Sequence, residues 1–123
     1  MTKKRVLDIG NCAMDHGAIR ALIEREFDAE LVQCHDQQSA LKQLKQTSVD
    51  LVLINRKLDR DGSDGLAILK QLTSEHGPAL PVMLITNYEE YQQIAEDHGA
   101  VPGFGKAELT SATTRERLAK HLE

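Results

Sequence analysis

Aromatic residues, cysteine and long apolar runs are all scarce in this chain. Aromatic side chains make up 3% of its 123 residues, tryptophan is absent, and there are two cysteines. So few aromatics argue against a stacking platform for single-stranded nucleic acid. No apolar run approaches the roughly 20 residues that a membrane-spanning helix needs, and the N-terminus lacks the apolar segment of a secretion signal. We therefore expect neither a membrane span nor direct contact with nucleic acid.

The distribution of charge and the two cysteines indicate what this chain binds and where it is found. The formal net charge is −4, and the lysines and arginines are scattered along the chain, whereas a nucleic-acid-binding face would cluster them. Cys12 and Cys34 lack the close spacing of a metal-binding cysteine pair, so we expect no metal and no cofactor. Free thiols fit a reducing compartment, which predicts a cytoplasmic protein. The length predicts one domain over residues 1–123.

Apolar runs that fit strands alternate with amphipathic runs that fit helices. Unbroken apolar runs are typical of parallel strands that are covered on both faces. Apolar residues three and four positions apart are typical of helices that bury one face. Five strands alternating with five helices predict an α/β protein with a parallel sheet and right-handed crossovers. The expected strands lie at Val6–Ile9, Glu30–Cys34, Leu51–Ile54, Pro81–Thr86 and Val101–Gly105.

Polar residues before the amphipathic runs predict where helices begin. Asp36 and Ser63 precede two of these runs, and each can accept a hydrogen bond from the first turn of a helix. Asn87, followed three residues later by Glu90, fits a capping pair. The last helix should begin near Thr110.

Four stretches together resemble the receiver domain of bacterial response regulators, over essentially the whole chain. Their spacing is that of the family, apart from a short insertion after the third strand. The resemblance implies a doubly wound five-stranded parallel sheet of the flavodoxin-like receiver type, with strand order 2-1-3-4-5 and a site at the carboxyl ends of the strands. The four stretches are Arg5–Asn11, Asp50–Asn55, Pro81–Thr86 and Gly99–Lys106.

Most of the residues that carry out phosphorylation in that family are replaced here. By position, Asn55 stands where the family has its phosphoacceptor Asp, and Gly10 and Asn11 stand where it has its acidic pair. Thr86 and Lys106 match the switch residue and the strand-five Lys of the family. A carboxamide is a poor nucleophile, and neutral ligands add little affinity for Mg²⁺. The resemblance therefore implies a receiver that accepts no phosphoryl group at Asn55 and holds no metal.

The resemblance also implies that the usual switch is lost. Gly103 stands where the family has an aromatic residue that reports movement of the switch residue, and Ala107 replaces the usual Pro. Without a phosphoryl group, we expect Thr86 to satisfy a strand end and Lys106 to bond the carbonyl of Asn55.

These departures lead to a functional expectation. The chain should be a non-enzymatic, phosphorylation-independent interaction module in two-component-type signalling, with Asn55 mimicking the unphosphorylated state. Its partner should be a signalling protein, such as a histidine kinase, an output domain or another regulator. The family implies that residues 87–123 form the partner surface, and a homodimer through the same residues stays open.

Two alternatives use other side chains. Asp59 or Asp61, in the carboxylate-rich stretch Asp59–Gly65, can be a relocated phosphoacceptor, although a plain polar turn explains the stretch more simply. Cys12 follows a strand and precedes a helix, where a helix N-terminus lowers a thiol pKa, as in a phosphatase-like enzyme. The spacing to Arg20 is C-x7-R, however, and such phosphate loops resemble C-x5-R.

Three further groups carry expectations of their own. Cys12 and Cys34 end neighbouring strands, so they form either a redox pair or two free thiols. Asp8 interrupts the first strand, and we expect either a buried carboxylate with a raised pKa or one paired with a nearby donor. Histidines such as His16 and His35 show no ligand spacing and should be exposed at helix starts.

Overall fold

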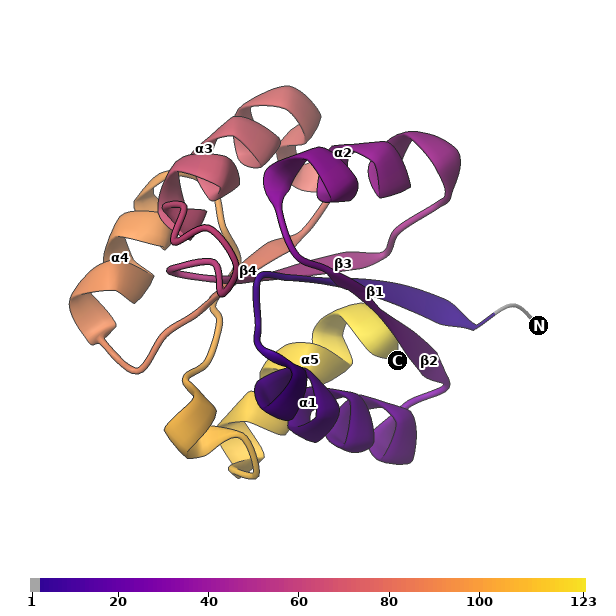
Figure 1. The fold of residues 1–123 in the computed structure, drawn as a ribbon. Helices are drawn as coiled ribbons and strands as arrows, with labels where there is room; N and C mark the ends of the chain where they lie inside the picture. The colour runs from indigo at the N-terminus through magenta and orange to yellow at the C-terminus, as the bar shows by residue number, and fades with distance from the viewer. Residues whose placement is uncertain (1–2) are drawn as a thin grey trace.

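A parallel sheet lies between two layers of helices in the computed structural model, which describes residues 3–123 (Figure 1). The strands are β1 (Lys4–Ile9), β2 (Ala29–Cys34), β3 (Leu51–Asn55) and β4 (Val82–Ile85). The α-helices are α1 (Ala13–Glu26), α2 (Gln37–Gln46), α3 (Gly65–His76), α4 (Glu89–Asp97) and α5 (Ala112–Leu122). Two short 3-10 helices, η1 and η2, span Gly77–Ala79 and Lys106–Glu108.

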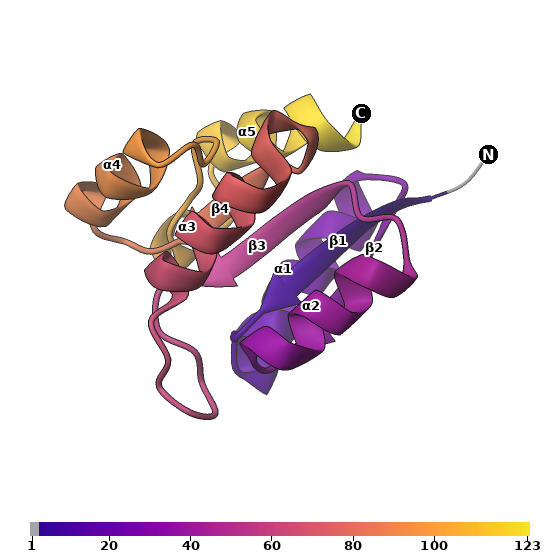
Figure 2. The same cartoon turned by 90° about the horizontal axis from the view of Figure 1, so that it is seen from above.

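The four strands are all parallel and have the order β2-β1-β3-β4, as Figure 2 shows from above. Their register places Ile9 beside both Cys34 and Ile54. The chain therefore leaves β1 toward one edge of the sheet and β3 toward the other, and ligand sites of such sheets lie where the order reverses. The predicted α/β class, the parallel sheet and the five helices are confirmed.

Strands β3 and β4 are buried on both faces, as their apolar sequences predict, whereas the edge strand β2 is partly exposed. In β3, Val52 and Ile54 pack with α2, α3 and α4, whereas Leu51 and Leu53 pack with α1 and α5. All four side chains are fully buried. Burying an aliphatic side chain contributes roughly 1.5–3 kcal/mol, so these central strands anchor both helical layers.

The predicted fifth strand is wrong. Residues 101–105 run beside β4 but form a single parallel bridge, between Ile85 and Phe104. Pro102 has no N–H to give to a ladder. The sheet therefore has four strands within the described residues, and segment 101–105 is held at its edge in another way.

Segment 101–105 is held by two main-chain hydrogen bonds, from the N–H of Val101 to Val82 and from the N–H of Thr86 to Phe104. The side chain of Gln92, from α4, adds to them. Its Nε2 donates to the carbonyl oxygen of Leu84 at 2.9 Å, and its Oε1 accepts from the N–H of Gly103 at 3.3 Å. The same Nε2 lies 3.4 Å and 3.5 Å from the carbonyl oxygens of Thr86 and Phe104. One amide thus joins α4, β4 and segment 101–105. We refer to this arrangement as the Gln92 bridge.

The helix starts agree with the sequence in part. Asp36 caps α2 as predicted, and together with Ser39 it forms a capping box. Ser63 does not cap α3, because Asp64 accepts the first-turn hydrogen bond instead. The N–H of Ser63 donates to the carboxylate of Asp61 at 2.9 Å. Ser63 is therefore hydrogen-bonded within the turn before α3, and Asp64 caps the helix.

Two further helix starts differ from the sequence prediction. Asn87 does not cap α4; its Oδ1 accepts from the N–H of Ala107 at 3.0 Å. The last helix begins at Ala112 rather than near Thr110, and its cap is Ser111. Asn87 thus ties the end of β4 to the segment that precedes α5.

Within residues 3–123, no helix combines the length and the apolar character needed to cross a bilayer.

Substituting Gly103 tests the Gln92 bridge. A Cβ at this position would overlap the carbonyl oxygen of Leu84 and crowd the amide of Gln92. We expect Gly103→Ala to lower the free energy of unfolding by roughly 2 kcal/mol, because backbone has to move. Gly17→Ala is the control: that glycine is exposed in α1 with nothing near its Cβ position, so stability should rise by up to about 1 kcal/mol. Urea unfolding of both variants measures the difference, and equal stabilities would contradict the bridge.

Candidate functional site

A pocket of about 190 Å³ opens at the carboxyl ends of β3 and β4. It is lined by three of the residues singled out from the sequence, Asn55, Thr86 and Lys106, whereas Gly10 and Asn11 do not line it. The other lining residues are Arg56, Lys57, Ile85, Asn87 and Tyr88. The lining thus carries three cationic side chains and no carboxylate.

The side-chain amide of Asn55 is hydrogen-bonded to the main chain. Its Nδ2 donates to the carbonyl oxygen of Lys57 at 2.7 Å and, more weakly, to that of Gly10 at 3.4 Å. The start of α3 packs closely against it, because a Cβ at Gly65 would overlap the carbonyl oxygen of Asn55. A carboxylate at this position has no hydrogen to donate to either carbonyl. The local structure therefore fits an amide.

Gly10 turns the chain as it leaves β1. Its φ is +80°, in the region that favours glycine. A Cβ at this position would overlap the side chain of Leu58, which is buried above it. A side chain at position 10 is thus excluded both by the backbone conformation and by the packing.

Asn11 points into the protein interior. It is fully buried, and its Nδ2 donates to Oδ1 of Asp8 at 2.5 Å. Its Oδ1 has no hydrogen-bond partner among the described residues. Asn11 therefore donates to Asp8 and does not line the pocket.

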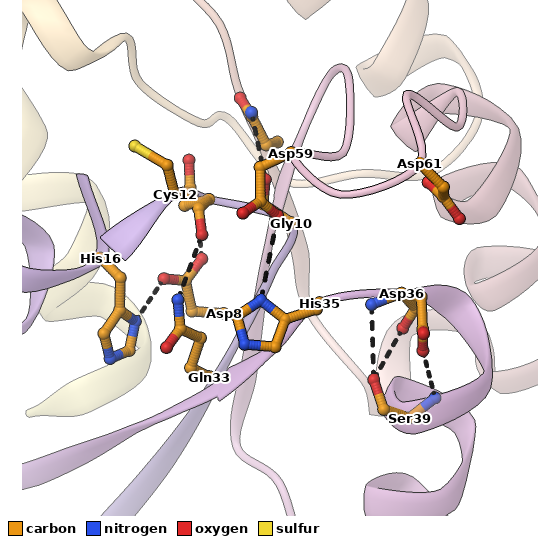
Figure 3. Close-up of polar contacts among 12 residues, drawn as sticks. Asp8, Gly10, Cys12, His16, Gln33, His35, Asp36, Ser39, Asp59 and Asp61 are labelled. Carbon is orange, nitrogen blue, oxygen red and sulfur yellow. Dashed lines mark hydrogen bonds and ion pairs between the residues drawn. The ribbon is translucent and has the colours of Figure 1, made fainter. Parts of the chain in front are cut away.

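Asp8 is the centre of a buried polar cluster at the end of β1. It is fully buried, and its second oxygen lies 2.7 Å from Nδ1 of His16 (Figure 3). Burial raises the pKa of Asp8, while the hydrogen bonds with Asn11 and His16 act in the opposite direction. Both expectations for Asp8, a raised pKa and a nearby donor, are confirmed. The prediction that His16 is exposed is wrong, because its side chain is only 12% exposed and packs onto this carboxylate.

Lys106 forms an ion pair that the sequence did not reveal. Its Nζ lies 2.7 Å from the carboxylate of Asp15, in the first turn of α1. This bond lowers the pKa of Asp15. The expected bond from Lys106 to the carbonyl of Asn55 is wrong. An acidic residue in a first helical turn is the one sequence signal for Asp15, and it is also explained by the helix dipole.

Asp59 and Asp61 lie outside the pocket. The N–H of Asp59 donates to the carbonyl oxygen of Gly10 at 3.0 Å, and its carboxylate is 4.0 Å from Nδ1 of His35. Figure 3 shows Asp59 next to Gly10 and Asp61 away from it. Asp61 is exposed, and hydrogen bonds from Ser63 lower its pKa. The loop before α3 is thus stabilised by the main chain of Asp59 and by the carboxylate of Asp61.

Both cysteines are free thiols. Cys34 is buried, which raises its pKa to about 11. Cys12 is half-buried, and its Sγ donates to Asp15 at 3.3 Å. Across residues 3–123, no three His, Cys, Asp or Glu side chains are placed to share a metal ion.

Thr86, Arg56 and Tyr88 complete the pocket. The Oγ1 of Thr86 accepts from the N–H of Tyr88 at 3.3 Å. The guanidinium of Arg56 lies 4.5 Å above the ring of Tyr91, and Tyr88 meets Tyr91 edge to face. Arg56 and Tyr88 therefore form the wall on this side, and Tyr91, which contacts both, lies outside the lining. The arrangement offers hydroxyl, ammonium and guanidinium donors, and it offers no carboxylate nucleophile.

Comparisons with known proteins agree with this geometry. The family model of the response regulator receiver domain matches residues 13–107. The RcsB response regulator of Salmonella typhimurium is 16% identical with a TM-score of 0.79, and the match covers 100% of this chain and 63% of that one. A response regulator from Thermotoga maritima is 19% identical with a TM-score of 0.78, and the match covers 97% of both chains.

A response regulator receiver protein from Pseudomonas putida is 15% identical with a TM-score of 0.79, covering 98% of both chains. No curated protein sequence matches the chain. At such low identities the solved structures establish a common fold. The chain spans less than two thirds of the RcsB chain, so nothing about the remainder of that protein follows for this one.

The charge of Asp8 can be tested through the pH dependence of stability. Because its native pKa lies above the unfolded value of about 3.9, ionisation costs stability as the pH rises through the native pKa. We expect Asp8→Asn to raise the melting temperature at about pH 8 and to gain less at about pH 4, where the native carboxyl is already protonated. Thermal melts of both proteins measure this. A gain that is larger at low pH would contradict the assignment.

Proposed function

Because the chain belongs to the response regulator receiver family, we propose that it is an atypical member that acts as a protein-interaction module without being phosphorylated. Receiver domains are generally signalling modules in two-component systems rather than enzymes. The observation that carries the proposal is the amide of Asn55 at the centre of the pocket, with its nitrogen bound to the main chain.

The first support is the lack of a nucleophile. Phosphorylation of a receiver is an attack by a carboxylate oxygen on phosphorus. The amide of Asn55 carries no full negative charge, and its Nδ2 is committed to the carbonyl oxygen of Lys57. Asp59 and Asp61, the alternative acceptors, do not line the pocket. We propose that neither accepts a phosphoryl group.

The second support is the lack of ligands for a hard cation. Mg²⁺ takes anionic oxygen ligands. At the positions of the acidic pair, Gly10 has no room for a side chain and Asn11 faces the interior. Two carboxylates at this end of the sheet are engaged with other side chains, Asp8 with His16 and Asp15 with Lys106. We propose that the site works without a metal.

The third support is a network that holds one conformation. Lys106 is tied to Asp15, 91 residues away in the chain. The Gln92 bridge fixes α4 against β4 and segment 101–105, and Gly103 has no side chain to reorient. A switch needs two arrangements of similar free energy, and these bonds favour one. We propose that the protein stays in this one conformation.

A signalling protein is the proposed partner: a histidine kinase, an output domain or another regulator. We propose that residues 87–123 present the binding surface, with a homodimer through the same residues as the alternative. The two free thiols favour a reducing compartment such as the cytoplasm.

The intact mass after incubation with acetyl phosphate and Mg²⁺ tests this function. We expect no added phosphoryl group on the native chain, because both the nucleophile and the metal ligands are missing. A typical receiver domain that carries the acceptor Asp and the acidic pair is the positive control, and it should gain the adduct under the same conditions. Asn55→Asp separates the two deficits: it restores the nucleophile alone, so its labelling should be slower than that of the control.

An acyl phosphate can hydrolyse in acid before its mass is recorded. The mass is therefore measured at neutral pH, where acyl phosphates survive. A labile adduct on the native chain would contradict the proposal. In that case Asp59→Asn and Asp61→Asn would show which carboxylate accepts the group.

A further inference from the structure

A groove runs between α4 and α5. It consists of two hollows of about 180 Å³ and 250 Å³, and Glu89, Gln92 and Arg117 line both of them. Gly103 and Gly105 contribute main chain to the lining of the first hollow, and both pack closely against β4 and the residues that follow it, because a Cβ at either position would overlap neighbouring atoms. Together the hollows form one continuous depression, which we call the α4–α5 groove. Its remaining lining residues are Thr86, Asn87, Gln93, Glu96, Phe104, Ala107, Glu108 and Thr113.

The groove carries an excess of negative charge. Three carboxylates line it, those of Glu89, Glu96 and Glu108. None of them belongs to an ion pair among residues 3–123. The one cation in the lining is Arg117, and its Nη1 donates to the carbonyl oxygen of Gly103 at 2.5 Å. The carboxylates therefore face the groove without a cationic partner.

The rest of α4 has the same sign of charge. Glu90 and Asp97 are also exposed on this helix, and it contains no lysine or arginine. Removing acidic side chains from water costs free energy unless a cation meets them. A surface of this kind favours a cationic partner and repels an acidic one.

We propose that the α4–α5 groove docks a basic segment of the signalling partner, with arginine or lysine side chains entering the two hollows. The inference rests on the proposed function, since it names the partner chemistry of that interaction module. Such side chains pack their apolar stems along the walls and bring their charged ends to carboxylates. The floor beneath them is rigid, because Gln92 is held by the bridge to β4.

The spacing of the carboxylates sets the spacing of the cations. Glu89 and Glu96 are seven residues apart on α4, which corresponds to about 10 Å along the helix axis. In a peptide with polyproline II conformation, which has three residues per turn, side chains three residues apart lie on the same face and are separated by about 9 Å. A segment with two basic residues at positions i and i+3 therefore matches the groove.

A second copy of this chain is the less suitable occupant. Its α5 would have to supply the cations, but Arg115 already pairs with Glu26 and Glu123, and Arg117 is bound to its own main chain. Lys120 is then the one cation that α5 can offer, against the three carboxylates of the groove. Each copy also has a formal net charge of −4, so two copies repel one another.

Titration of the ¹⁵N-labelled chain with a synthetic peptide tests the proposal. The probe is an acetylated and amidated Gly-Arg-Ser-Gly-Arg-Gly peptide, and its control replaces both arginines with citrulline, which is neutral and of similar shape. We expect the arginine peptide to shift the amide signals of residues 89–96 and 103–108, and the citrulline peptide to leave them unchanged. Shifts that are absent, or that are the same for both peptides, would overturn the proposal.

Paired variants show whether the groove itself binds the probe. Glu89→Gln with Glu96→Gln should weaken binding by about tenfold, as two charge-assisted contacts are lost. Glu24→Gln with Glu75→Gln removes the same charge from exposed positions on α1 and α3, and it should leave the affinity unchanged. Equal weakening by both pairs would overturn the proposal, because the peptide would then respond to net charge alone.

Sedimentation velocity of the native chain shows whether a second copy of the chain, rather than a basic segment, occupies the groove. A dimer that the Glu89→Gln, Glu96→Gln variant dissociates would mean that a second copy fills the groove, and would overturn the proposal. Failure here is separate from failure of the proposed function. A chain that gains no phosphoryl group but binds no basic peptide would keep its function and lose this partner chemistry.

Discussion

Polar groups at the carboxyl edge of the sheet have to be satisfied by the protein itself, and this constraint shapes the site. A buried carboxylate without a partner is costly, and here Asp8 is matched by Asn11 and His16. On the pocket side, Lys106 is matched by Asp15, and Asn55 by main-chain carbonyls. The side chains that could bind a cation or attack phosphorus are thereby used to stabilise the fold.

The fold could be predicted from the sequence because its strongest signals are apolar. Runs such as Leu51–Ile54 can be buried on both faces only in a covered parallel sheet, and the alternation with helical patterns then fixes the layers. The fifth strand could not be predicted correctly, because Val101 and Phe104 look strand-like in isolation. In the structure the segment forms a single bridge to β4, and the side chain of Gln92 reaches it from another helix, a contact of which a linear pattern contains no sign.

The site was predictable in position but not in its bonds. The register of β3 and β4 places Asn55 beside Ile85, next to Thr86, and the single bridge between Ile85 and Phe104 brings Lys106 to the same pocket. The choice of Asp15 over Asn55 as the partner of Lys106 is a contact across 91 residues of chain, and it depends on where α1 begins. In the same way, the exposure of His16 depends on which face of β1 carries Asp8. Such choices are set by packing, which local sequence does not encode.

In the function that we propose, the receiver fold keeps a binding surface and works without its chemical trigger. The central claim is that the region from β4 to η2 does not respond to a phosphoryl group. Backbone amide spectra recorded with and without beryllofluoride and Mg²⁺, a mimic of phosphorylation that bonds to an acceptor carboxylate, test it most directly. The account predicts unchanged signals for residues 84–106. Shifts that centre on Asn55, Thr86 and Lys106 would contradict it.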